Sequence, residues 1–422
     1  MFEALKSSLK LGDLRKKILF TLAMFVVFRI GAHIPVPGIN HTAIEQLIKG
    51  GGSLLGFFDV ISGGAFKRFS IFAMSITPYI NASIIMQLLT VVIPKLEQLS
   101  KEGEEGRKKI TQYIRYGTVV LGFVQSLGMA FTLRAAGALE NPSFGSYMII
   151  AITLTAGTAF LMWLGEQITE KGIGNGISLI IFAGIVAGIP GGLYNIYEAV
   201  RVGTVNPLSV VLLVIVAALV IAAVVAVNEG QRRIPVQYAK RVVGRRVYGG
   251  QSTHIPLKVN QAGVIPIIFA SSILMFPTTI ANFFPNNAFS KWINSVFAWG
   301  SVSHSIMYAL LIIFFTYFYT AITFNPMDVA DNMKKYGGFI PGLRPGRPTA
   351  EYLDKILTRI TLSGAVFLAL IAILPAIILG ATKIPNIYFG GTSLLIVVGV
   401  ALETMKQIES HLLMRHYQGF MK

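Results

Sequence analysis

The sequence predicts an all-α polytopic membrane protein with ten transmembrane helices. Of its 422 residues, 54% are hydrophobic and only 13% are charged, and the mean hydropathy is +0.65. Soluble domains carry about 25% charged residues, so this chain has too little polar surface for a water-soluble globule. A bilayer core about 30 Å thick needs about 20 apolar residues in a helix. Ten runs near that length lie at about 18–36, 70–93, 116–135, 147–165, 177–193, 208–227, 262–283, 304–324, 360–380 and 388–405.

The distribution of basic residues predicts that both termini are cytoplasmic. With ten spans, 28 of the 36 Lys and Arg residues fall on the side that holds both termini, and 7 fall on the opposite side. Basic loops stay on the cytoplasmic side of a membrane. An error of one span would destroy this asymmetry, so the charges support the count of ten independently. A cleaved signal peptide is not expected, because the first run is long and no small-residue cleavage site follows it.

A short motif recurs in the second and seventh runs. The segments 77–83 (TPYINAS) and 265–271 (IPIIFAS) share Pro, Ile, Ala and Ser at the same offsets. The two runs are five spans apart, so the halves would enter the membrane in opposite directions and form an inverted repeat. We therefore expect an N-terminal half at 1–205 and a C-terminal half at 206–422. The alternative is that proline near a helix end is ordinary in membrane helices.

One apolar segment, 54–66, is too short to span a membrane. It precedes the second run on the outer side. Short apolar segments of this kind are re-entrant or buried in a protein cavity. The alternative, a stub packed on the outer surface, has equal weight on the residues alone.

The chain has no visible catalytic or energy-coupling chemistry. It contains no cysteine, which excludes disulfides and thiol catalysis. No phosphate-binding loop is present, the glycines at 172–176 suit a tight cytoplasmic turn, and His411 and His416 are five residues apart and do not suit a metal. The spans hold almost no acidic residues, which argues against a secondary transporter of small solutes. Arg29, inside the first run, is expected to pair with backbone carbonyls or to snorkel. We expect no enzyme, no cofactor and no metal.

Two cytoplasmic loops, 229–260 and 325–359, are much longer than a connection requires. Orientation alone would need only one or two basic residues per loop, and these loops carry thirteen. Such surfaces suit an acidic partner, anionic lipid or RNA phosphate. Orientation alone remains the alternative to this docking role. The candidate docking residues of the first loop are Arg232, Arg233, Lys240, Arg241, Arg245 and Arg246.

Four blocks of sequence resemble the bacterial SecY family. They are 101–116 (KEGEEGRKKITQYIRY), 163–178 (WLGEQITEKGIGNGIS), 251–266 (QSTHIPLKVNQAGVIP) and 388–397 (YFGGTSLLIV). The likeness extends over essentially the whole chain, apart from the external loops and the C-terminal tail. In that family the channel subunit of the protein translocase has two five-helix halves that close like a clam shell around a central pore, with a short plug helix on its outer side.

The resemblance also implies site residues. A gated lateral opening would lie between the second and third spans and the seventh and eighth, with Gln87 and Gln125 at its seam; ordinary hydrogen bonding between helices is the alternative for these two side chains. The segment 54–66 would be the plug, with Phe57, Phe58, Asp59, Val60, Ile61, Ser62 and Gly63 as its site residues. The aliphatic pore ring would consist of Ile76, Ile80, Ile177, Ile181, Ile268 and Ile396.

By the same resemblance, the chain would be a passive gated channel of the bacterial cytoplasmic membrane. It would pass unfolded secretory proteins, recognised by their signal peptides, across the lipid bilayer and release membrane proteins sideways into it. The motor ATPase SecA and the ribosome would dock on the long loops, with Arg344 in the second loop, and the small membrane subunits SecE and SecG would be partners. A secondary transporter of small solutes is the first alternative, and a membrane scaffold without a pore is the second.

Overall fold

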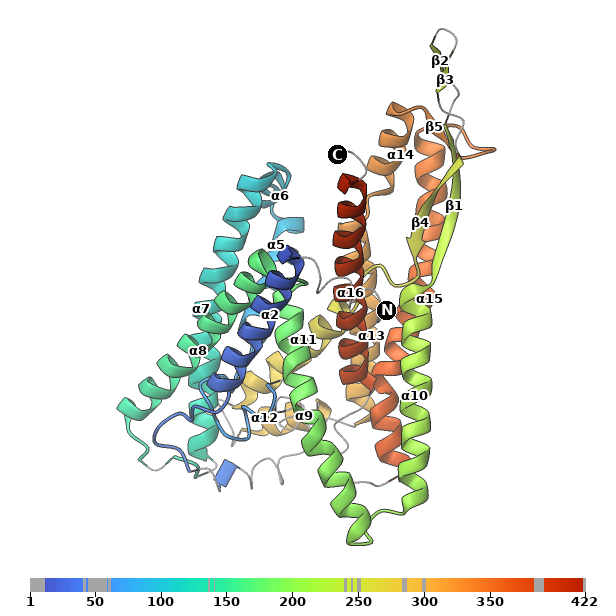
Figure 1. The fold of residues 1–422 in the computed structure, drawn as a ribbon. Coiled ribbons are helices and arrows are strands. Elements are labelled where there is room, and N and C mark those ends of the chain that lie inside the picture. The colour runs from blue at the N-terminus through green and yellow to red at the C-terminus, as the bar shows by residue number, and fades with distance from the viewer. Residues whose placement is uncertain are drawn as a thin grey trace.

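Helices form most of this computed structural model of the chain (Figure 1). The structure describes residues 12–40, 43–44, 59, 62–135, 137–139, 141–238, 241–243, 246–248, 252–282, 287–297, 301–382 and 391–419. Apolar sequence favours helices in a membrane because a helix bonds its own N–H and C=O groups. The helices are α2 (Gly12–Gly31), α5 (Thr77–Val92), α6 (Pro94–Lys101), α7 (Glu104–Ala135), α8 (Phe144–Lys171), α9 (Gly176–Arg201), α10 (Pro207–Glu229), α11 (Ile265–Asn282), α12 (Ala288–Val296), α13 (Val302–Thr323), α14 (Pro326–Lys335), α15 (Arg347–Thr382) and α16 (Gly391–Gly419).

Each apolar run overlaps one of these helices, and several can cross a membrane. Among the described residues, six helices are individually long and apolar enough to span, or up to seven if the bent pair α5 and α6 counts as one span. That pair bends by 101°, because Ile93 is extended before Pro94, as residues before proline prefer. A further apolar helix, Ile265–Thr278, is shorter. The chain is therefore a multi-pass membrane protein.

The repeated motif marks two helix starts. Residues 70–76 of the second run form turns, and α5 begins only at Thr77 with Pro78 in its first turn. α11 begins in the same way at Ile265, one residue before Pro266. Proline lacks an N–H and is tolerated at the start of a helix, where that group would have no partner. The second apolar run is therefore helical over a shorter stretch than its composition predicts.

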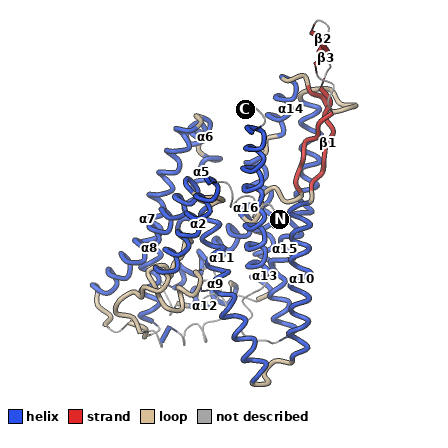
Figure 2. Tube along the Cα trace, viewed as in Figure 1, coloured by secondary structure: helices blue, strands red, loops and turns tan. Residues whose placement is uncertain are grey.

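The expectation of an all-α fold is wrong in the long loop 229–260. There β1 (Gln231–Tyr238) pairs antiparallel with β4 (Ser252–Lys258) from Gln231↔Lys258 to Gln237↔Ser252, and Figure 2 draws this ribbon in red. The strand β5 (Gly338–Phe339) joins β1, and β2 (Arg241–Val243) pairs with β3 (Arg246–Tyr248).

The ribbon forms because buried and exposed residues alternate along β1, the period of a strand. Ile234 and Val236 are buried between exposed neighbours, and they pack with Leu257, Met333 and Leu353. This small core joins the two long loops. The second loop is itself structured, since it contains α14, β5 and the beginning of α15.

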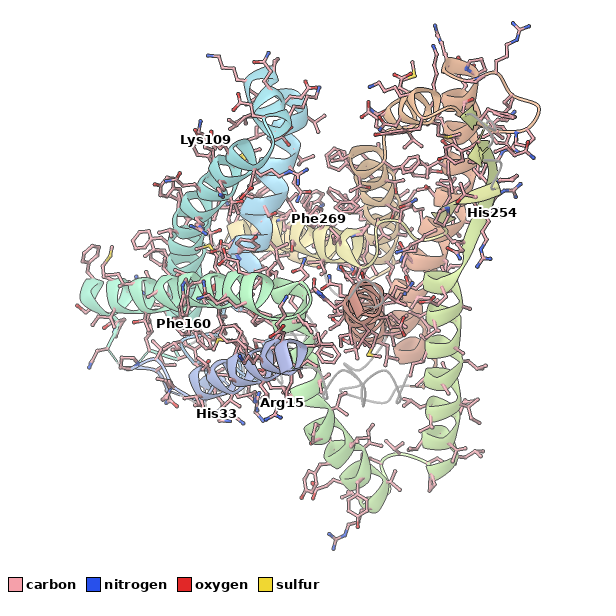
Figure 3. All side chains as sticks on the ribbon, turned by 45° about the horizontal axis from the view of Figure 1, so that its top comes forward. Arg15, His33, Lys109, Phe160, His254 and Phe269 are labelled. Carbon is pink, nitrogen blue, oxygen red and sulfur yellow. The ribbon has the colours of Figure 1, made fainter. Side chains whose placement is uncertain are left out.

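In Figure 1 the helices gather on two sides. α2 and α5 to α8 lie on one side, α10 and α13 to α16 lie on the other, and α9 and α11 lie between them. α11 contacts α5 and α7, and α9 contacts α16, so these helices join the two sides. The largest core cluster draws on both sides, with Phe28 of α2, Phe269 of α11 (labelled in Figure 3) and Ile396 of α16 among its members.

Candidate pore constriction

Five of the six isoleucines expected in the pore ring line one small cavity. Its volume is about 20 Å³, which is room for about one water molecule. The five come from four helices and from the residue that precedes α5. They are Ile76, Ile80, Ile181, Ile268 and Ile396.

Local sequence features place these side chains. Pro78 fixes the start of α5, so that Ile76 and Ile80 lie one helical turn apart on the same face. At the start of α9, Asn175 Oδ1 accepts hydrogen bonds from the N–H groups of Ile177 (3.1 Å) and Ser178 (3.3 Å). This cap fixes the position at which α9 begins, and with it the position of Ile181 further along the helix.

Glycines allow the helices around the cavity to approach closely. A Cβ at Gly399 of α16 would lie 2.6 Å from Val264 Cγ1, just before α11. A Cβ at Gly176 of α9 would lie 1.9 Å from the carbonyl oxygen of Gly165 in α8. The expected tight turn between α8 and α9 is present and has Gly174 in the left-handed region (φ +87°). Bulkier residues at these positions would hold the ring-bearing helices apart.

Ile177 is placed differently from the other five. It is half-buried and is not among the residues that line the cavity. A Cβ at Gly165 would lie 2.6 Å from Ile177 Cδ1, so this side chain packs between α8 and α9. The structure thus brings five members of the expected ring together and leaves Ile177 one helical turn away, next to α8.

Hydroxyl groups also line the cavity, and sequence reasoning missed them. These residues are Ser75, Thr77, Ser271 and Ser272, together with a further isoleucine, Ile267. Ser75 has a positive φ of 51°, and its buried Oγ has no hydrogen-bond partner among the described residues. The repeated motif could have pointed to these hydroxyl groups, because its second copy ends in Ser271. The constriction is therefore an aliphatic ring with a hydroxyl-bearing border.

Such a constriction can act as a seal. A narrow apolar passage excludes ions because water does not fill it. The chemistry of a seal needs no proton transfer or nucleophile. No group of three or more His, Cys, Asp or Glu residues that could hold a metal ion occurs in the described part of the chain.

Only part of the expected plug lies in the described residues. Phe57, Phe58, Val60 and Ile61 lie outside them, whereas Asp59, Ser62 and Gly63 lie within them. Asp59 Oδ1 accepts a hydrogen bond of 2.7 Å from the Lys67 N–H. Burial raises the pKa of Asp59, and the bond from Lys67 opposes that rise. Ala65, fully buried, belongs to the same core cluster as Ile76 and Ile80.

The two glutamines expected at a lateral seam lie on α5 and α7. Gln87 is half-buried, and its Nε2 lies 3.3 Å from Ser83 Oγ on the same helix. Gln125 is buried, with 9% of its surface exposed. Both helices contact α11, which supplies the other side of the expected seam.

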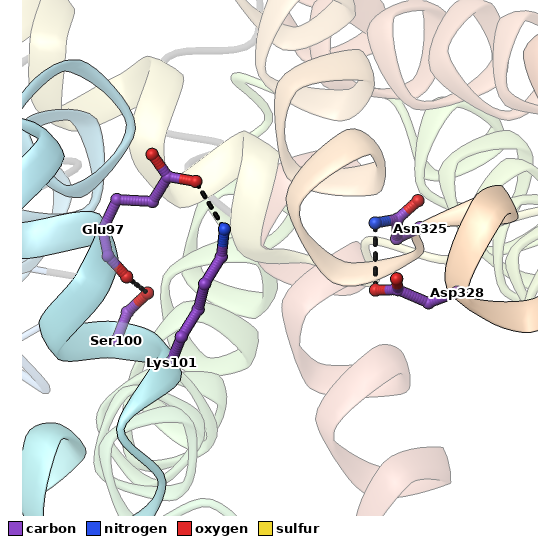
Figure 4. A network of polar contacts seen from close by, with 5 residues as sticks. All are labelled: Glu97, Ser100, Lys101, Asn325 and Asp328. Carbon is purple, nitrogen blue, oxygen red and sulfur yellow. Dashed lines mark hydrogen bonds and ion pairs between the residues drawn. The ribbon is translucent and has the colours of Figure 1, made fainter.

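Charged groups on α6 and α14 interact between the two sides of the molecule. Figure 4 shows Lys101 at the end of α6 between its partner Glu97, 2.7 Å away, and Asp328 of α14. The hydrogen bond with Glu97 raises the pKa of Lys101, and the charge of Asp328 contributes in the same direction. Asp328 itself accepts a hydrogen bond of 2.9 Å from Asn325 Nδ2. The attraction between Lys101 and Asp328 therefore acts between α6 and α14.

The expected docking residues are only partly described. Arg232 and Arg233 are exposed on β1, and Arg344 is exposed in the turn before α15. Arg241 and Arg246 are backbone members of β2 and β3. The remaining two, Lys240 and Arg245, lie outside the described residues.

Comparison with known proteins identifies relatives along the whole chain. The SecY family model matches residues 70–405. The protein translocase subunit SecY of Halalkalibacterium halodurans is 52% identical over 432 residues, which cover 100% of both chains. The protein of the same name from Escherichia coli (strain K12) is 50% identical over 420 residues, which cover 98% of this chain and 95% of that one. A solved structure of a protein conducting channel matches with a TM-score of 0.67 at 20% identity, covering 94% of this chain and 92% of that chain. That last likeness shows a shared fold.

Proposed function

The chain belongs to the SecY family and is a protein translocase subunit, a protein-conducting channel and not an enzyme, and we propose that its isoleucine ring is the seal of a passive gated pore. The channel passes unfolded secretory proteins across the membrane and releases membrane proteins sideways into the lipid bilayer. The two relatives named above are both translocase subunits, and the secondary-transporter interpretation has no support.

The observation that carries the seal is the convergence of five isoleucines on a cavity of about 20 Å³. Because these side chains come from α5, α9, α11, α16 and the turn before α5, a separation of the two sides of the molecule would widen the ring. Aliphatic side chains can then surround a passing polypeptide without selecting its sequence. Ile177 would join the ring only through movement of α9 relative to α8.

The seal is tested by ion conductance in planar bilayers. Replacing both Ile80 and Ile268 with serine should raise the ion leak, because water can then fill the constriction. The matched control replaces Ile85 of α5 and Ile280 of α11, which are 43% and 44% exposed, and should leave the leak at the wild-type level. An unchanged conductance in the ring variant, with the protein correctly inserted, would count against the ring.

The finer architecture follows the family. Ten spans in two inverted halves, 1–205 and 206–422, are supported by the equivalent proline starts of α5 and α11. In this proposal the segment 54–66 plugs the ring from the outer side. The lateral gate would open between α5 and α7 on one side and α11 and α13 on the other, with Gln87 and Gln125 at the seam.

The cytoplasmic β ribbon and the turn that carries Arg344 would dock SecA and the ribosome. Their exposed arginines support this, because a phosphate-rich or acidic partner is attracted to clustered cations. SecE and SecG are expected as small membrane partners. The chain would lie in the bacterial cytoplasmic membrane with both termini in the cytoplasm, as the distribution of basic residues indicates.

A further inference from the structure

The plug segment ends in a hydrogen-bonded turn at residues 62–67, here called the plug turn, which extends one residue beyond the segment. Ser62 is buried, and its Oγ lies 3.1 Å from both the Asp59 carbonyl oxygen and the Phe66 N–H nitrogen. The Gly64 N–H donates to the Asp59 carbonyl over 2.8 Å, and the bond from Lys67 to Asp59 closes the turn. Two further bonds connect the plug turn to the residues that lead to α5: the Phe69 N–H donates to the Phe66 carbonyl and the Ser70 N–H donates to the Ala65 carbonyl, each over 2.9 Å.

The plug turn is held between α2 and α9. Arg29, in the last turn of α2, donates a hydrogen bond of 2.8 Å from Nη1 to the carbonyl oxygen of Gly63. From the other side, the backbone of Gly184 in α9 approaches so closely that a Cβ at Gly63 would lie 3.0 Å from Gly184 Cα and 3.2 Å from Arg29 Nη1. Gly63 has a φ of +68°, so glycine is required here both for the backbone and for the space.

We propose that Arg29 is a latch for the plug: its guanidinium holds the plug turn through Gly63 while the channel is closed, and this bond breaks when the channel opens. The inference rests on the proposed plug function of segment 54–66. Arg29 is then a positioning residue. It acts on the seal from α2, a helix that contributes no residue to the ring cavity.

The chemistry of this contact suits a reversible latch. A hydrogen bond from a charged donor is stronger than a neutral one, yet the acceptor is a neutral carbonyl and no carboxylate lies within ion-pair distance of Arg29 in the described part of the chain. A buried ion pair would be much harder to separate. Arg68, an exposed cation just beyond the plug turn, repels Arg29 and so weakens the latch.

The first test measures ion conductance of the full chain in planar bilayers. Arg29→Gln should increase the open-to-closed ratio about tenfold, which corresponds to about 1.4 kcal/mol, near the lower end of the contribution of a hydrogen bond to a charged group. Arg29→Lys keeps a charged donor and should restore part of the seal. Arg68→Gln removes a cation from the same neighbourhood without removing the latch, and should leave the leak at or below the wild-type level.

The second test reports the position of the plug turn itself. The chain has no cysteine, so Ser62→Cys introduces a single thiol at a site that is 1% exposed. Labelling by a membrane-impermeant maleimide from the outer side should be slow in this variant and about tenfold faster when Arg29→Gln is added. A general loss of structure would also abolish precursor export, and we expect export to be retained.

The outcomes separate the latch from the channel. If Arg29→Gln leaves both the leak and the labelling rate of Cys at position 62 unchanged, while the serine variants at Ile80 and Ile268 leak, the latch is refuted and the ring stands. If the ring variants do not leak, the seal proposed above is refuted instead. Equal leaks from the Gln and Lys variants at Arg29 would refute a role for the charged donor.

Discussion

Replacing Gly176 with alanine should loosen the constriction, because α8 and α9 leave no space for a methyl group there. A Cβ at Gly176 would lie 1.9 Å from the Gly165 carbonyl oxygen and 2.9 Å from Ile168 Cβ. Cβ atoms essentially never approach other heavy atoms within 3.0 Å, so the start of α9 must move by about 1 Å. Overpacking of this kind costs about 1–3 kcal/mol. Since Ile181 lies on the same helix, the displacement reaches the ring.

A matched control lies on the same helix. Gly191 of α9 has no heavy atom within 4 Å of the position its Cβ would occupy, so alanine there should stabilise the helix by about 0.5–1 kcal/mol. Thermal unfolding in detergent should therefore show a lower midpoint for Gly176→Ala and an unchanged or higher midpoint for Gly191→Ala. Only the first variant should leak ions in planar bilayers. Equal midpoints and equal conductance in the two variants would refute the argument that close α8–α9 contact positions Ile181.

Two further predictions concern Arg344 and Lys101, which lie on the face that we propose is cytoplasmic. Arg344→Glu should weaken SecA-driven translocation without impairing membrane insertion, because Arg344 is exposed and, within the described part of the chain, only its backbone carbonyl has a hydrogen-bond partner, Thr349 Oγ1 at 2.8 Å. Export should stay normal in the control Arg201→Glu, and normal export in both variants would remove this turn from the docking surface. Lys101→Glu should increase the distance between α6 and α14, because it replaces an attraction to Asp328 of α14 by a repulsion. Spin labels on these helices should report a longer distance at low salt that returns toward the wild-type value at high salt, since exposed charges are screened. A distance that does not change at low salt would contradict the attraction between Lys101 and Asp328.

Composition and periodicity predicted the helical part of the fold well. An apolar helix in a membrane needs only its own residues to bond its backbone, so the runs coincide with α2, α5, α7 to α11, α13, α15 and α16. The β ribbon was missed because Ile234 and Val236 alternate with basic and polar residues that were interpreted only as charge. Their burial depends on Met333 and Leu353, about a hundred residues away in sequence.

The site was predicted less completely, for a related reason. The ring isoleucines were selected by family resemblance, since composition alone would assign them to lipid-facing or core positions. The hydroxyl border of Ser75 and Ser272 depends on where the turn before α5 meets α11. The bond between Arg29 and Gly63 joins residues 34 positions apart. The sequence indicated that Arg29 would either pair with a backbone carbonyl or snorkel, and only the fold shows that it pairs, and with the carbonyl of Gly63.

The central claim is that a polypeptide passes through the isoleucine ring. Disulfide trapping tests it directly, with a translocating precursor stalled in the channel and carrying one cysteine, and with cysteines introduced one at a time at Ile80 and Ile268. The absence of native cysteine makes each cross-link unambiguous. Cysteines at Ile85 and Ile280, exposed on the same two helices, provide the comparison. We predict efficient cross-links at Ile80 and Ile268 and weak ones at Ile85 and Ile280; equal or stronger cross-links at the two exposed positions would contradict passage through the ring.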